Sequence, residues 1–146
     1  MATHSDQQAP LYTRFASVLI RLLGPSRSVR LLGDGHLPLY VEHQGLSPDR
    51  LYHLISVAHI ETSGCQAFYD PEMVFELSLS PRIAYARPLS YRNDCLGLNQ
   101  QVHSYDSAGI KVSTNRALSL ELDDFARTWF LNIEYQGYLD ESAHVN

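Results

Sequence analysis

The stretch "PLSYRNDCLGLNQQV", residues 88–102, predicts two β-strands joined by a tight turn. Asn93-Asp94 follows the β-favouring run "LSY" and precedes the apolar run "CLGL". Asn and Asp form turns at low cost because their side chains hydrogen-bond to nearby backbone, and Gly97 permits an unusual backbone angle. Strands joined by so short a turn pair antiparallel, since parallel pairing needs a long crossover. The stretch therefore indicates an antiparallel sheet.

Short strand-like runs continue on both sides of this turn, and a helical pattern flanks the series at each end. We predict strands over residues 37–45, 51–62, 73–79, 82–91, 96–105 and 108–114, with loops at 25–36 and 63–72. Apolar residues recur every three or four positions over 11–24 and 117–138, which predicts two amphipathic helices. The order of elements predicts an α+β fold, with a meandering antiparallel sheet of five to six strands flanked by an N-terminal and a C-terminal helix.

The chain length of 146 residues fits a single domain. We expect this domain to span residues 11–139, between a flexible tail at 1–10 and another at 140–146. Pro10 is typical of the first turn of a helix and Gly137 of a helix end, so the expected boundaries lie close to these two residues.

The net charge of −5 is concentrated near the C-terminus. Residues 117–146 hold six carboxylates and Arg127 as the single basic residue, and the whole chain has one lysine, Lys111. Direct binding of DNA or RNA is therefore disfavoured, because such binding depends on basic groups that neutralise phosphate. No apolar run is long enough to cross a membrane and the polar N-terminus lacks a signal-peptide pattern, so we expect a cytoplasmic protein that does not bind membranes.

Candidate catalytic and metal-binding residues do not form a recognised pattern. The seven histidines show no close ligand spacing, so we expect no metal and no other cofactor. His36, His43 and His103 are expected at the surface or at strand edges. Cys65 and Cys95 stand apart without a C-x-x-C motif, which favours two buried, inert thiols. An alternative is a small enzyme in which Cys65 or Asp94 works with a histidine.

Five residues are the better candidates for binding a partner. The predicted turn accounts for Asp94 but not for Arg92, and the two residues together form one possible contact pair. Glu121, Asp124 and Glu134 fall on the outer face of the C-terminal helix, where they would meet a basic surface. We therefore predict a protein that binds through its exterior and has no catalytic residues.

The sequence also resembles a known family. The similarity lies in three segments: "DPEMVFEL" at 70–77, "PLSYRNDCLGLNQQV" at 88–102 and "LDDFARTWFLNIEYQGY" at 122–138. These segments resemble a family of small proteobacterial proteins of unknown function that occur mostly on plasmids and integrative elements. The resemblance covers about seventy residues of the C-terminal half. Cys95 and Asn99 stand where that family would have aromatic residues.

The resemblance implies a cytoplasmic protein of a mobile genetic element in a bacterial host. Such elements carry inhibitors of host defence, so we expect an anti-CRISPR-type protein that binds a Cas protein or a guide-RNA complex. This expectation rests on the kind of genetic element that carries genes of the similar family, and not on the residues themselves. The alternatives are the small enzyme described above and an accessory protein of plasmid maintenance or transfer.

Overall fold

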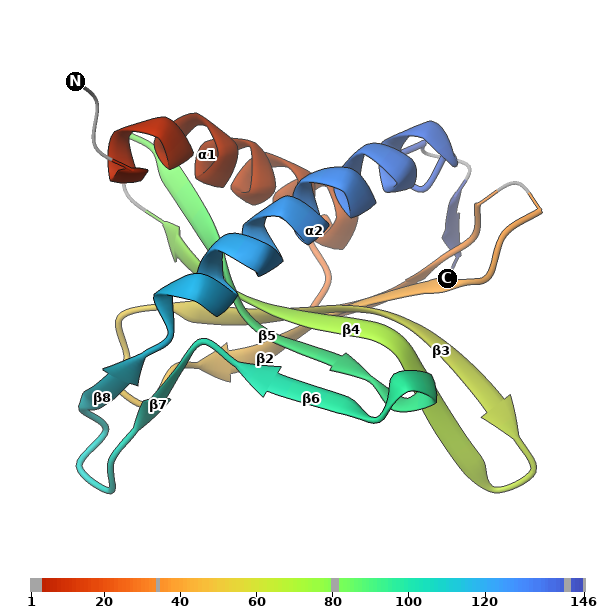
Figure 1. Cartoon of the computed structure of the whole chain (residues 1–146). Coiled ribbons are helices and arrows are strands. Elements are labelled where there is room, and N and C mark those ends of the chain that lie inside the picture. Colours follow the sequence, from red (N-terminus) through yellow and green to blue (C-terminus); the bar gives the residue numbers. More distant parts are fainter. Residues whose placement is uncertain (1–3, 34, 80–81, 141–142, 146) are drawn as a thin grey trace.

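The computed structural model describes residues 4–33, 35–79, 82–140 and 143–145, and it has the predicted α+β architecture. Two helices lie side by side on one face of an antiparallel sheet (Figure 1). The elements in chain order are α1 (His4–Leu23), β1 (Ser28–Leu31), β2 (Leu39–Leu46), β3 (His53–Ser63), β4 (Gln66–Leu79), β5 (Ala84–Asn93), the 3₁₀ turn η1 (Asp94–Leu96), β6 (Leu98–Gln101), β7 (His103–Tyr105), β8 (Lys111–Thr114), α2 (Arg116–Tyr135) and β9 (His144–Val145).

The main sheet is a meander, as its short turns predict. Its strand order is β6-β5-β4-β3-β2-β1-β9, so six strands follow one another in sequence and β9 pairs with β1. The strands β7 and β8 form a separate antiparallel hairpin. The predicted strand over 96–105 is therefore two strands in different sheets, with Val102 between them buried in the core.

Two predicted loops contain strands. The segment 63–72 was expected as a loop, but β4 already begins at Gln66 and pairs with β3 over most of its length. Its register with β3 shifts between Ala58 and Ile60, opposite Pro71. Proline is tolerated inside a sheet at such bulges, which explains why this loop-like composition lies within a strand. The short run around Val29, predicted as loop, is β1.

The two expected tails also contain regular structure. Residues 4–10 belong to α1, which begins well before Pro10. At the other end, β9 pairs with β1, and the backbone N–H of Leu32 donates to the carbonyl of Ala143 at 2.9 Å. Both additions depend on partners distant in the sequence, so local composition did not indicate them. Residues 1–3, 141–142 and 146 of the expected tails lie outside the described residues.

The core lies between the helices and the sheet, and three phenylalanines connect its layers. Phe15 of α1 contacts Phe130 of α2 and Phe75 of β4, with ring centroids 5.1 and 5.8 Å apart. Phe75 and Phe130 also contact each other at 5.1 Å, and all three side chains are buried. Edge-on and tilted contacts of this kind add to the stabilisation that burial alone provides. Trp129 of α2 packs beside them.

A buried carboxylate joins the two helices. Asp123 of α2 is fully buried, and its Oδ2 accepts hydrogen bonds from Gln8 Nε2 and Tyr12 OH of α1, both at 2.7 Å. Burial and the bond to Asp123 raise the pKa of Tyr12 to about 12, so this hydroxyl keeps its proton at neutral pH. Gln8 lies in the segment expected as a tail, and this bond gives a tertiary reason for its helical structure.

We predict that Trp129→Ala lowers the free energy of unfolding by about 3–5 kcal/mol, because it removes a large buried ring. Leu131→Ala, on the exposed face of the same helix, is the matched control and should cost less than about 1 kcal/mol. Urea denaturation measures both values. Equal losses in the two variants would contradict the assigned orientation of α2.

Candidate functional site

The turn at Asn93-Asp94 has the predicted strand–turn–strand form. The side-chain oxygen of Asn93 accepts a hydrogen bond from the backbone N–H of Leu96 at 3.2 Å and so caps η1. Gly97 closes the turn with φ of 66°, a left-handed angle that glycine adopts without strain. The strands β5 and β6 then pair from Asn93↔Leu98 to Ser90↔Gln101.

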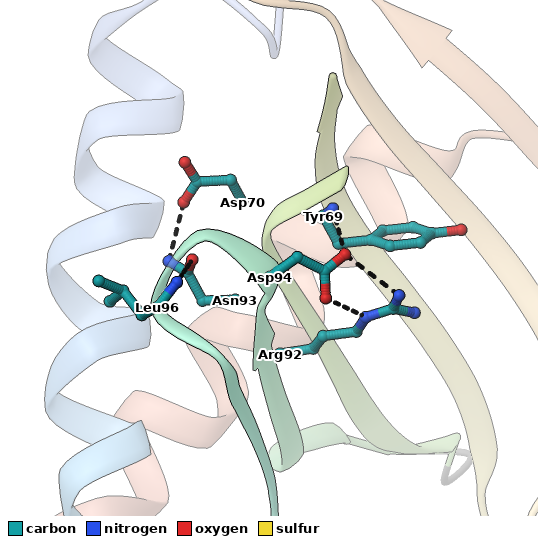
Figure 2. A network of polar contacts seen from close by, with 6 residues as sticks. All are labelled: Tyr69, Asp70, Arg92, Asn93, Asp94 and Leu96. Atoms are coloured by element: carbon teal, nitrogen blue, oxygen red, sulfur yellow. Dashed lines mark hydrogen bonds and ion pairs between the residues drawn. The ribbon is translucent and has the colours of Figure 1, made fainter. Parts of the chain in front are cut away.

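Arg92 and Asp94 form a two-pronged ion pair at this turn (Figure 2). Arg92 Nε lies 2.9 Å from Asp94 Oδ1, and Arg92 Nη2 lies 3.1 Å from Asp94 Oδ2. Asp94 Oδ2 also accepts from the backbone N–H of Tyr69 at 2.8 Å, and the guanidinium lies 4.1 Å from the centroid of the Tyr69 ring. The pair therefore connects the turn to β4.

The charges of this pair stabilise each other. The hydrogen bonds from Arg92 and from the Tyr69 backbone lower the pKa of Asp94 below its ordinary value. The bond to Asp94 raises the pKa of Arg92 in turn. The side chains are 40% and 24% exposed, so a partner could reach both groups, but their hydrogen bonds are already directed within the domain.

Asp70 is a further member of the site that sequence reasoning did not single out. Its Oδ1 accepts a hydrogen bond from Asn93 Nδ2 at 2.8 Å (Figure 2). The Asn93 amide also donates to Tyr91 OH at 3.3 Å. The available signal was the "DPE" at 70–72, quoted above only as a family feature. Asp70 and Tyr69 bring β4 to the turn across more than twenty residues of sequence.

The prediction of buried cysteines was wrong. Cys65 and Cys95 are both exposed and free, because Cys65 lies at the tip of the β3–β4 hairpin and Cys95 lies in η1. Desolvation and the nearby Asp70 raise the pKa of the Cys95 thiol, which disfavours the reactive thiolate. Within residues 4–33, 35–79, 82–140 and 143–145, no histidine forms a hydrogen bond or ion pair with Cys65 or Asp94.

The histidines are used elsewhere, and the expectation for His103 was wrong. His103 is buried and lies 2.9 Å from Glu76 Oε1, while Tyr105 OH donates to Glu76 Oε2 at 2.7 Å. Burial lowers the pKa of His103 even though Glu76 acts in the opposite direction. The three side chains attach the β7–β8 hairpin to β4. His43 and His53 form a second pair, with Nε2 and Nδ1 3.0 Å apart.

The three acidic residues predicted on α2 lie on or beside its solvent-facing side, but two are paired with arginines. Glu134 accepts two hydrogen bonds from Arg14 Nη2, both at 3.0 Å. Asp124 accepts from Arg127 Nη1 at 2.9 Å. Glu121 is exposed and has no ion pair in the described part of the chain. The negative field of this face is therefore weaker than the sequence suggested.

No group of three or more histidine, cysteine or acidic side chains among the described residues could hold a metal ion. None of the described helices is long and apolar enough to cross a membrane.

Fold and site together define a small α+β domain in which two helices cover a meandering sheet and a polar turn is connected to β4. The chain belongs to the family described as a domain of unknown function, DUF6908, which matches residues 14–139. No curated protein and no solved structure matched the chain.

We predict that in Asp94→Asn the free energy of unfolding changes less with pH in the acid range than it does in the original protein. The pKa of Asp94 is lowered in the folded state, so its stabilisation is present above the ordinary value of 3.8 and is lost as pH falls through the folded pKa. Urea denaturation between pH 7 and about pH 2 should show the variant less stable at neutral pH, with the gap closing below about pH 4. Glu42→Gln is the matched control; a gap independent of pH would contradict the ion pair.

We predict that Glu76→Gln destabilises the domain by about 2 kcal/mol, since it weakens buried hydrogen bonds of a charged group. Ser113→Ala in the same hairpin removes only an exposed hydroxyl contact with Ser104, and should change stability by less than about 0.5 kcal/mol. Thermal unfolding compares the two variants, and hydrogen exchange should show local loosening of β7–β8 in the first alone.

Proposed function

We propose that this protein is a non-enzymatic interaction protein that binds its partner through the outer face of α2. One observation supports this most directly: Tyr135 is 93% exposed and Leu131 is 47% exposed on the solvent side of this helix. Tyrosine is enriched at protein interfaces, where its ring provides contact area at a low entropy cost. A folded domain gains no stability from such side chains in water.

The acidic groups beside these side chains suggest the chemistry of the partner. Glu121 and Asp124 are exposed on the same side of α2, about two to four turns before Leu131 and Tyr135. We name these four residues the α2 surface. Its apolar and acidic composition fits a partner surface that carries lysine or arginine around an apolar centre. Surfaces that hold nucleic acid have such basic groups.

The specific proposal is inhibition of a host defence system by binding a Cas protein or guide-RNA complex. Support comes from the acidic α2 surface and from the resemblance to proteins of plasmids and integrative elements. An accessory role in plasmid maintenance or transfer would use the same surface with another partner. The enzyme alternative has weaker support, because neither Cys65 nor Asp94 contacts a histidine among the residues described above.

The proposal is tested by affinity capture from a bacterial lysate that contains CRISPR complexes, followed by binding measurements with the purified complex. We expect Leu131→Ala/Tyr135→Ala to weaken binding at least about tenfold, as expected for loss of central interface side chains. Glu121→Lys/Asp124→Lys should also weaken binding, and its effect should diminish as salt rises.

The matched control is Glu42→Lys, which reverses an exposed charge on β2, away from the helices. It should leave binding unchanged, and all variants should unfold at temperatures close to that of the original protein. If a complex is captured but its affinity is unchanged by all four substitutions on the α2 surface, the assignment of this surface as the binding site is contradicted. Failure to bind any Cas or guide-RNA complex would contradict the specific partner.

A further inference from the structure

A large pocket is lined by residues from the first half of α1 and the first turns of α2. Both helices begin on the left in Figure 1. The pocket has a volume of about 950 Å³, at the upper end of the range for small-molecule sites. Residues from α1, α2, β4, β5, the end of β8 and the segment before β3 line it. The pocket is separate from the turn at Asn93-Asp94 and from the four residues of the α2 surface.

Two arginines give this pocket a positive charge. Arg87 of β5 and Arg116 of α2 line it, and no aspartate or glutamate is present among its described lining residues. Neither guanidinium has an ion pair with the rest of the described chain. Two arginines that line one hollow and have no ion pair within the described chain favour the binding of an anion there.

Tyr12 supplies an aromatic surface beside this charge. Its hydroxyl proton is committed to the buried Asp123, so the ring is the part of Tyr12 that remains for a ligand. The Arg87 guanidinium carbon lies 5.3 Å from the centroid of the same ring. This cation–π contact holds a charge and a flat apolar surface next to each other. Tyr52 and Tyr85 contribute two further rings to the lining.

Hydroxyl groups and a helix end complete the lining. Ser78 and Thr114 line the pocket, and neither side chain has a hydrogen bond to another described residue. Arg116 is the first residue of α2, after the N-cap Asn115, so the positive end of this helix dipole also faces the region. Each of these features is weak alone, and all act on an anion in the same direction.

We propose that this pocket binds a nucleotide-sized organic phosphate. Guanidinium groups recognise phosphate oxygens through paired, charge-assisted hydrogen bonds, and tyrosine rings stack on nucleobases. The two arginines would hold the phosphate and the tyrosines the base, within a volume that accommodates both. The site uses different residues from the α2 surface, so it does not rest on the proposed function.

Isothermal titration calorimetry with adenosine 5′-monophosphate as the probe tests this inference. We expect saturable binding that weakens about tenfold or more in Arg87→Gln and in Arg116→Gln, as loss of a charge-assisted hydrogen bond predicts. Adenosine and inorganic phosphate, titrated separately, should each bind at least about tenfold more weakly than the intact nucleotide, because each engages only half of the site.

Arg21→Gln is the matched control, since Arg21 is exposed on α1 and does not line the pocket. It should bind the nucleotide like the original protein, and thermal unfolding should show all three variants folded. The inference is overturned by no binding at millimolar nucleotide, by equal binding in all three variants, or by inorganic phosphate binding as tightly as the nucleotide. The last result would indicate a general attraction of anions.

Discussion

The contact among Phe15, Phe75 and Phe130 is the interaction on which the rest of this structure depends. A meandering sheet whose strands follow one another in sequence has no crossover helices, so its apolar face must be covered by helices from the two ends of the chain. The three rings join α1, α2 and β4 at one point in the core. The first and last parts of the chain thereby become adjacent.

The packing of the two helices against each other also brings together the polar side chains that hydrogen-bond between them. Asp123 is tolerated at full burial because Gln8 and Tyr12 of the other helix donate hydrogen bonds to it. The same bonds orient Tyr12, whose ring lies beside Arg87 at the edge of the arginine-lined pocket. In the sequence Asp123 is simply one of several acidic residues. In the structure it fixes the position of Tyr12, and so determines which aromatic surface lines the nearby pocket.

The polar turn after β5 shows how structural and functional interpretations of the same residues meet. Asn93 and Asp94 form the turn, but their side chains also hold β4 through Asp70 and the backbone of Tyr69. Most hydrogen-bonding capacity of this corner is therefore used within the domain. The α2 surface differs, because Tyr135 and Leu131 have large exposed fractions that the fold itself does not use. This contrast makes α2 the better candidate for contact with a partner.

Local sequence determined the class of fold, the existence of the two helices and the turn at Asn93-Asp94, because hydrophobic period and turn chemistry act over a few residues. The strand around Pro71, the pairing of β9 with β1 and the burial of His103 and Asp123 were decided by the tertiary structure. Each depends on a partner far away in the chain, such as Glu76 for His103 and Gln8 for Asp123. The arginine-lined pocket has the same origin, since Arg87 and Arg116 become neighbours of one hollow only when α2 packs beside β5.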